Sequence, residues 1–228
     1  MLIDVPLDER KTKLLDVVAC SASSTLSFAD VGATWKVNGG YAEYLTCNYS
    51  ISRAVLIDVN ITTELVDRAR AIDAVVLGGR CTQADVIQAL GYVDFVILFD
   101  FLLHQVDPDW KEVLRSLSRC TNTFVIFHPS WIGSKASIRL LDLALEDYFS
   151  NVPHNRSDAV YCGVYEELAS SRSRLDIWQW GITSSDLIDV MHELGFYKSY
   201  QIGYESALGL KNFVYDGFVF VRSDNKET

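Results

Sequence analysis

The chain has 228 residues, of which 49% are hydrophobic and 22% are charged, and its formal net charge is −10. These proportions exclude a disordered protein and predict one globular domain over residues 1–228 with a substantial core. The acidic balance argues against nucleic acid or an anionic membrane surface as the main partner.

No segment has the composition of a membrane anchor or an export signal. The longest apolar run, residues 95–103, is interrupted by Asp100 and is too short to cross a bilayer. Residues 1–9 contain aspartates and a proline, unlike a secretory signal. Five cysteines are scattered without a Cys-x-x-Cys pair, which favours reduced thiols in a cytoplasmic protein and gives no sign of a metal site.

Hydrophobic periodicity and capping residues predict strands that alternate with helices up to residue 127. Thr62 can cap a helix, and the pair Asp107–Pro108 is typical of an N-cap followed by the first helical position. In chain order, strands are expected over residues 26–31, 53–58, 74–77, 93–99 and 123–127, and helices over residues 8–20, 40–46, 62–71, 84–90 and from 107 onward.

The end of the chain departs from this alternation. Thr183 can cap a helix that Gly195 ends, and residues 196–203 and 217–222 then read as two strands without a helix between them. Strands so close together cannot be joined by a helical crossover and should pair antiparallel. We therefore predict an α/β fold with a doubly wound, mostly parallel seven-stranded sheet, helices on both faces and a C-terminal antiparallel hairpin.

Two acidic residues end neighbouring predicted strands beside a glycine-rich turn. Asp30 precedes Gly32 at the end of the first strand, and the pair Gly39–Gly40 opens the following helix. Glycine lets a ligand approach the backbone, and the start of a helix offers unpaired N–H groups. Asp58 ends the next strand. Carboxylates at the ends of adjacent parallel strands suit a ligand with ribose hydroxyls or an amino group.

The order of Asp30-Val31-Gly32, Asp58, the run of residues 94–104 and the terminal hairpin resembles the class I S-adenosylmethionine-dependent methyltransferases. The resemblance is close over residues 26–127 and looser in the tail. It implies that S-adenosylmethionine is the cofactor, that the first acid and the glycine loop hold its methionine part, and that the second acid takes the ribose hydroxyls. The implied cofactor-binding residues are Asp30, Gly32, Ala33, Gly39, Gly40, Tyr41, Asp58, Val59, Arg80, Cys81, Phe99, Asp100 and Phe101.

The chain departs from the family pattern in two loops. Thr34 and Lys36 stand where the family usually has glycines, so the loop after the first strand is longer and bulkier. Gly78-Gly79-Arg80-Cys81 follows the third strand, where the family commonly has an acid that contacts the adenine amino group. Adenine must then be read by the backbone, by Cys81 or by a neighbour such as Thr82.

Two histidines follow the expected strands at the edge that carries the acids. His104 lies just past the fourth strand and His128 just past the fifth. Either could serve as a base for a hydroxyl acceptor, and a packed, hydrogen-bonded histidine is the alternative for His104. The sequence from His128 to Trp131 resembles a motif of amino-methylating enzymes, but it follows the fifth strand instead of the fourth. Trp131 and Trp178 could each form a pocket wall or belong to the core.

Residues 133–182 separate the fifth strand from the last helix, a distance far longer than a connection requires. We expect a helical insertion that covers the substrate, with helices over residues 137–149 and 160–170. A packing ornament or a dimer surface is the alternative. The candidate substrate-binding residues are Trp131, His154, Arg156, Tyr161 and Trp178.

The sequence therefore predicts an enzyme that transfers a methyl group from S-adenosylmethionine to an oxygen, nitrogen or carbon atom of a small molecule. Two other classes stay open. One is a methyltransferase-like fold that has lost catalysis and acts as a binding or partner subunit. The other is a nicotinamide-dependent Rossmann enzyme, which the missing Gly-x-Gly-x-x-Gly motif and the terminal hairpin disfavour.

Overall fold

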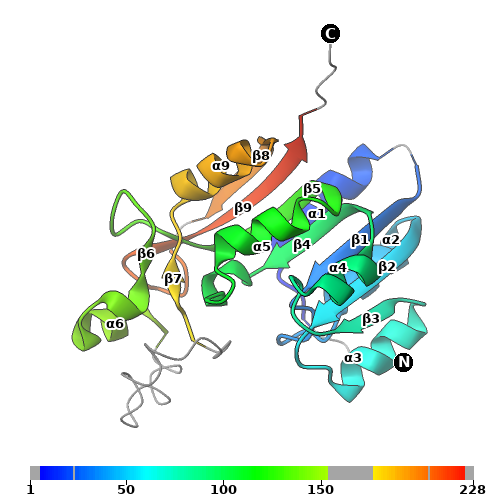
Figure 1. Ribbon diagram of the computed structural model, residues 1–228, viewed down its shortest axis with the longest axis horizontal. Helices are drawn as coiled ribbons and strands as arrows, with labels where there is room; N and C mark the ends of the chain where they lie inside the picture. The colour runs from blue at the N-terminus through cyan, green and yellow to red at the C-terminus, as the bar shows by residue number, and fades with distance from the viewer. Residues whose placement is uncertain (1–5, 23, 154–176, 205, 224–228) are drawn as a thin grey trace.

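The computed structural model describes residues 6–22, 24–153, 177–204 and 206–223, which form a sheet with helices on both faces (Figure 1). Seven strands make the sheet in the order β3-β2-β1-β4-β5-β9-β8. Strands β3 to β5 pair in parallel, whereas β9 runs antiparallel to both β5 and β8, so the predicted fold class is confirmed. The strands are β1 Leu26–Val31, β2 Ile51–Asp58, β3 Val75–Gly78, β4 Val93–Phe99, β5 Thr121–Trp131, β8 Phe196–Tyr204 and β9 Phe213–Arg222.

Each face of the sheet has its own hydrophobic core. Helices α1, α2 and α3 contribute to one core, and α4, α5 and α9 contribute to the other. In β5, Val125 and Phe127 belong to the first core while Phe124 and Ile126 belong to the second, because alternate strand residues point to opposite faces. The helices are α1 Glu9–Ser21, α2 Gly40–Asn48, α3 Thr63–Ala71, α4 Ala84–Leu90, α5 Trp110–Leu117 and α9 Ser184–Glu193.

Local capping sets several of these helix boundaries as the sequence predicts. The Thr62 side chain accepts a hydrogen bond from the backbone N–H of Leu65, and Thr183 accepts one from Asp186. Gly195 follows α9 with φ of 83°, a conformation that other residues rarely adopt. The fold of the last helix and hairpin is therefore specified largely by its own sequence.

Helix α5 begins later than predicted, and the assignment of Asp107–Pro108 as its start is wrong. The helix begins at Trp110, and Asp109 is its N-cap. The Asp109 carboxylate accepts hydrogen bonds from the N–H groups of Lys111 (2.9 Å) and Glu112 (3.0 Å). These bonds satisfy two N–H groups that the start of a helix otherwise leaves unpaired, which fixes the boundary here.

Residues 137–149 do not form the single predicted helix. They form strand β6, Ile138–Arg139, then a 3-10 turn η2, Leu140–Asp142, and the beginning of helix α6, Leu145–Asn151. Strand β6 pairs antiparallel with β7, Trp180–Gly181, at the other end of the insertion. Pairing with a distant strand overrides a local helical pattern, and the sequence does not reveal that pairing. The predicted helix over residues 160–170 lies outside the described residues.

The loops after the parallel strands gather at one edge of the sheet. Strands β1, β2 and β4 lie side by side there, and the loop after β4 leads into a 3-10 turn, η1, Leu102–His104. Open parallel sheets bind ligands at this edge. Within the described ranges, no helix has the length and apolar character needed to span a membrane.

Candidate active site

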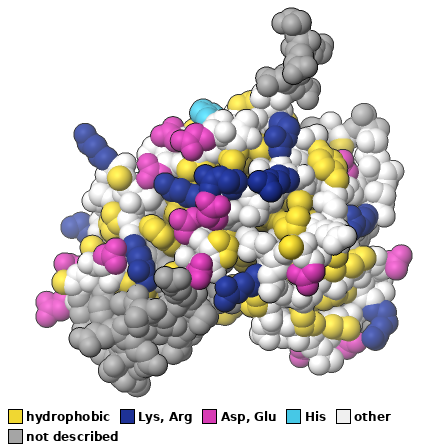
Figure 2. Space-filling view, viewed as in Figure 1, with side chains coloured by type: hydrophobic (Ala, Val, Ile, Leu, Met, Phe, Trp, Pro, Cys, Tyr) yellow, Lys and Arg dark blue, Asp and Glu magenta, His cyan; other side chains and the backbone are white. Residues whose placement is uncertain are grey.

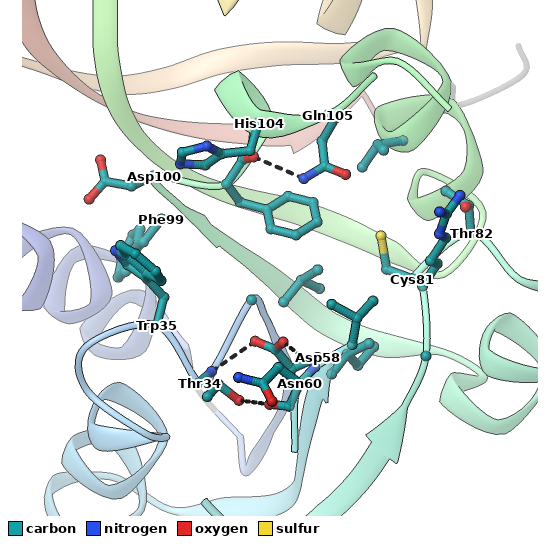
Figure 3. A pocket seen from close by; sticks show the side chains of 18 of the residues that line it. Thr34, Trp35, Asp58, Asn60, Cys81, Thr82, Phe99, Asp100, His104 and Gln105 are labelled. Carbon is teal, nitrogen blue, oxygen red and sulfur yellow. Dashed lines mark hydrogen bonds between the residues drawn. The ribbon is translucent and has the colours of Figure 1, made fainter. Parts of the chain in front are cut away.

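A cavity of about 670 Å³ opens at the carboxyl ends of the parallel strands (Figure 3). Its volume is in the range of cofactor and small-ligand sites. Its wall comes mainly from the loops that follow β1, β2, β3 and β4. The wall residues from these loops and strand ends include Gly32, Thr34, Trp35, Lys36, Asn38, Asp58, Val59, Asn60, Thr62, Gly79, Arg80, Cys81, Thr82, Phe99, Asp100, Phe101, His104, Gln105, Val106, Asp107 and Pro108.

The loop between β1 and α2 requires glycine where it meets the cavity. Gly32 has φ of 82°, and a Cβ added to it would lie 2.8 Å from Cδ2 of Phe101. No side chain fits at that distance, so the backbone approaches the aromatic ring more closely than any other residue allows. Trp35, in the same loop, is 47% exposed and stands at the cavity near Phe99 (Figure 3).

Asp58 ends β2 with its carboxylate held at the cavity wall. Its Oδ2 accepts a hydrogen bond from the backbone N–H of Thr34 (2.9 Å), and its Oδ1 accepts one from Asn60 (2.9 Å). A carboxylate oxygen can accept more than one hydrogen bond, so both oxygens keep capacity for ligand hydroxyls. The two loops thus orient the carboxylate and leave it able to accept further hydrogen bonds.

Asp30 is buried next to two wall residues, Val31 and Gly32. It is 3% exposed, and its Oδ2 has no hydrogen-bond partner among the described residues. Burial, and then the negative charge of Asp58, raise the pKa of Asp30 to about 7. A buried carboxyl in this state gains a strong interaction when a cation comes within reach.

Lys11 of α1 reaches the same end of the cavity, although it was not among the predicted site residues. Its Nζ lies 2.6 Å from Oδ2 of Asp100. It also lies 5.6, 5.5 and 5.3 Å from the ring centroids of Tyr41, Phe99 and Phe127. Burial works to lower the pKa of Lys11, but the charge and hydrogen bond of Asp100 together with Tyr41 and Asp8 outweigh it, and the pKa is raised. The lysine therefore stays charged and ties α1 to the loop after β4.

The opposite end of the cavity, beyond β3, is lined by Arg80, Cys81 and Thr82. Nη1 of Arg80 donates a hydrogen bond to the carbonyl oxygen of Asp107 (2.8 Å), which joins the loops after β3 and β4. Burial raises the pKa of Cys81 to about 12, so its thiol is neutral near pH 7. This loop thus supplies the cavity with polar groups but no negative charge.

His104 is held on the wall by the chain that returns from the insertion. Its Nδ1 lies 2.7 Å from the carbonyl oxygen of Ile177. A carbonyl can only accept, so Nδ1 carries the proton and the lone pair of the neutral ring is on Nε2. The predicted base candidate thus lies on the cavity wall with a defined tautomer.

We expect Trp180→Phe to lower the free energy of unfolding by about 1 kcal/mol, the usual net contribution of a hydrogen bond. Nε1 of Trp180 donates to the carbonyl oxygen of Gln105 (2.6 Å), and the neighbouring Gln179 N–H donates to the carbonyl of Leu103 (3.0 Å). These bonds brace η1 against β7. Urea unfolding measures the change, and an unaltered midpoint would show that the brace does not stabilise the fold.

Several predicted site residues lie away from the cavity wall. Strand β5 continues to Trp131 instead of ending at residue 127, so His128 and Trp131 are strand residues. His128 is fully buried, with Nε2 3.3 Å from Oγ of Ser130. The rings of Trp131 and Trp178 each lie 5.0 Å from that of Phe213 in the core. Also absent from the wall are Asp30, Ala33, Gly39, Gly40 and Tyr41, while His154, Arg156 and Tyr161 fall outside the described residues.

Comparison with known proteins gives a result at the level of structure. No family model and no curated protein matches the sequence. A 1,6-didemethyltoxoflavin-N1-methyltransferase from Burkholderia thailandensis, solved with 1,6-didemethyltoxoflavin and S-adenosylhomocysteine, is 10% identical with a TM-score of 0.60 over 95% of this chain and 79% of that one. The N-methyltransferase NodS from Bradyrhizobium japonicum, solved with S-adenosylhomocysteine, is 11% identical with a TM-score of 0.57 over 98% of this chain and 91% of that one.

A third similar structure is a magnesium protoporphyrin IX methyltransferase from Synechocystis PCC 6803 with bound S-adenosylhomocysteine. It is 11% identical, with a TM-score of 0.55 over 94% of this chain and 84% of that one. All three likenesses span nearly the whole chain. The chain has the fold of the class I S-adenosylmethionine-dependent methyltransferases.

Proposed function

We propose that this protein transfers the methyl group of S-adenosylmethionine to a small-molecule acceptor. The observation that carries the proposal is the buried carboxyl of Asp30, whose Oδ2 has no partner among the described residues. Asp30 is the penultimate residue of β1, next to β2, which positions the Asp58 carboxylate at the cavity wall. A ligand that carries both an ammonium group and ribose hydroxyls matches these two acids.

The residues of the cavity wall, with Asp30 buried behind it, fit this cofactor. Asp30 would receive the ammonium group of its methionine part, and Asp58 would accept hydrogen bonds from the ribose hydroxyls. Val59 and Phe101 offer apolar surface for the base. When bound, the cofactor supplies an electrophilic methyl group on sulfur. The protein must hold the acceptor in line with that methyl group and exclude water, which can contribute several kcal/mol of the rate enhancement.

His104 is the residue that we propose for removing a proton from the acceptor. Its ring lies on the cavity wall, and the Ile177 carbonyl fixes the tautomer in which Nε2 bears the lone pair. A base is needed only for an acceptor that carries its proton at neutral pH, such as a hydroxyl. The bracing of η1 by residues 177–180 supports the further proposal that the segment 133–182 shapes the acceptor site.

Charge and cavity favour a small acceptor over nucleic acid. The net charge is −10, and acidic and basic side chains are interspersed on the face shown in Figure 2. The small RNA methyltransferase HEN1 is also similar (12% identity, TM-score 0.58), but this chain covers only 25% of it.

The thiols of Cys20, Cys47, Cys81 and Cys120 are free, which supports a reducing compartment such as the cytoplasm.

The proposal is tested by calorimetric titration with S-adenosylmethionine and S-adenosylhomocysteine, followed by transfer of a labelled methyl group to fractionated small metabolites. We expect binding well below about 1 mM, the affinity at which only about 4 kcal/mol is gained. The absence of heat with either compound would contradict the proposal. Binding without transfer to any fraction would support a binding subunit that has lost catalysis.

Asp58→Ala is expected to weaken S-adenosylhomocysteine binding about tenfold to a hundredfold. The variant removes charge-assisted hydrogen bonds to the ribose hydroxyls, which contribute about 1.5–3 kcal/mol. Calorimetry measures the affinity, and Asp67→Ala, at an exposed position on α3, is the matched control. If a folded Asp58→Ala variant binds like the wild type, Asp58 serves only the N–H groups of Thr34 and Asn60.

A further inference from the structure

The part of the cavity beyond β3 needs a hydrogen-bond acceptor if it is to recognise the amino group of adenine. The 6-amino group of adenine donates hydrogen bonds, whereas the loop after β3 presents Arg80, Cys81 and Thr82. Arg80 carries only donors and already binds the Asp107 carbonyl. The Cys81 thiol is neutral and at most a weak acceptor. The Thr82 hydroxyl can donate as well as accept, so it does not distinguish an amino group from a carbonyl. A side-chain acceptor that discriminates adenine must therefore come from another loop.

Two carboxylates on the wall already have other partners. Asp58 accepts the N–H groups of Thr34 and Asn60 at the end of β2. Asp100 pairs with Lys11 at the opposite end of the cavity, beside the aromatic rings. Asp107, the third carboxylate on the wall, is exposed to solvent, and the test below includes it as the alternative.

Gln105 presents an amide oxygen whose direction is fixed. Its Nε2 donates a hydrogen bond to the carbonyl oxygen of Phe101 (3.1 Å). Exchanging the two amide atoms would set two oxygens against each other, so Oε1 is the atom that faces away from that carbonyl. The backbone of Gln105 is held as well, because its carbonyl accepts the Trp180 indole N–H. Figure 3 shows the Gln105 side chain on the cavity wall, with Oε1 on the side where Cys81 and Thr82 project.

We propose that Oε1 of Gln105 accepts a hydrogen bond from the 6-amino group of the cofactor's adenine. Gln105 is then the residue that selects adenine over other bases. Trp180 and the Phe101 carbonyl position it. This inference rests on the proposed function. It assigns base selection to the loop after β4, and so explains how the chain can recognise adenine without an acid after β3.

The test is the ratio of two dissociation constants measured by calorimetry. One ligand is S-adenosylhomocysteine, and the other is S-inosylhomocysteine, in which a carbonyl oxygen replaces the 6-amino group. We expect the wild type to prefer the adenosyl compound by about tenfold or more, the usual effect of one paired against one unpaired polar group. Gln105→Leu should bring the ratio close to one. Gln105→Glu should raise it, because a charged carboxylate is a stronger acceptor for the amino group than an amide oxygen and repels the carbonyl of the inosyl compound, although the variant gives up the bond to the Phe101 carbonyl.

Three outcomes separate this inference from the proposed function. An unchanged ratio in a Gln105→Leu variant that melts like the wild type overturns the inference alone. Loss of the preference in Asp107→Asn, with Gln105→Leu unaffected, also overturns it and assigns the role to the exposed Asp107. Absence of binding of both compounds to the wild type would instead overturn the cofactor assignment. Should Gln105→Leu fail to fold, the higher ratio expected for Gln105→Glu decides the question.

Discussion

Asp30→Asn is expected to stabilise the cofactor-free protein above pH 7 by up to about 4 kcal/mol, while weakening its binding of S-adenosylhomocysteine. The pKa of Asp30 is about 7 in the folded chain, against 3.8 for an unperturbed aspartate, and each unit corresponds to about 1.4 kcal/mol. The unfolded chain loses this proton near pH 4, and the folded chain keeps it until about pH 7. The folded state therefore loses stability as pH rises between these values, and the full loss is present above them.

Urea unfolding at about pH 4.5 and about pH 8 checks this expectation. The free energy of unfolding of Asp30→Asn should exceed that of the wild type by a large amount at the higher pH and by a small amount at the lower one. Asp67→Asn, on the exposed side of α3, is the control for removing a surface carboxyl. A second readout is proton release. At about pH 6 the ammonium of the ligand should drive ionisation of Asp30, so the binding enthalpy should depend on the buffer. Equal stability differences at both pH values would mean that Asp30 is ionised throughout.

Asp30→Asn is thus expected to change stability and cofactor binding in opposite directions. Above pH 7 the Asp30 carboxylate is a buried charge with an oxygen unpartnered among the described residues, which destabilises the free protein, whereas asparagine is neutral at every pH. A group that weakens the fold at the edge where ligands bind is the pattern expected of a functional site. With the ammonium group of the cofactor bound at Asp30 as proposed, the buried acid would link the stability of the fold to the affinity for the cofactor.

Local patterns predicted the part of the chain from β1 to β4 closely. Strands β1 and β4 and helix α4 begin and end where the sequence predicts. The apolar runs of the strands and the helical spacing of apolar residues in α4 are bounded there by Asp, Gly or polar residues. The prediction failed where a distant pairing decides the structure. Residues 138–139 join a strand that lies beyond residue 176, and β5 continues past residue 127 because β9 pairs with it as far as Trp131.

The same distinction separates the site residues that could be predicted from those that could not. Asp30 and Asp58 are recognisable because Asp30 is the penultimate residue of β1 and Asp58 the last residue of β2, so a local pattern places them at the ligand-binding edge. Lys11 contacts Asp100 across 89 positions of sequence, and Trp180 contacts Gln105 across 75. Their parts in the site depend on packing between segments, and their local sequences resemble those of an ordinary helix and an ordinary loop.

His128 should reduce stability in acid by about 3 kcal/mol, an effect opposite in sign to that of Asp30. Burial lowers its pKa from 6.5 to about 4, against the opposing charges of Asp216 and Asp100. As pH falls through this interval the unfolded chain takes up a proton that the folded chain does not, so stability is lost. Urea unfolding across the interval measures the slope. His128→Asn should abolish this contribution, and His192→Asn, at an exposed residue of α9, should leave it in place.

The two groups titrate over overlapping intervals, so their contributions should nearly cancel in the wild type. Between about pH 4 and pH 6.5, rising pH destabilises the folded state through Asp30 and stabilises it through His128. We therefore expect a shallow wild-type profile, a loss of stability toward acid in Asp30→Asn, and a loss toward neutral pH in His128→Asn. The double variant should again be shallow. A steep wild-type slope that persists in both single variants would show that neither buried group governs the pH dependence of folding.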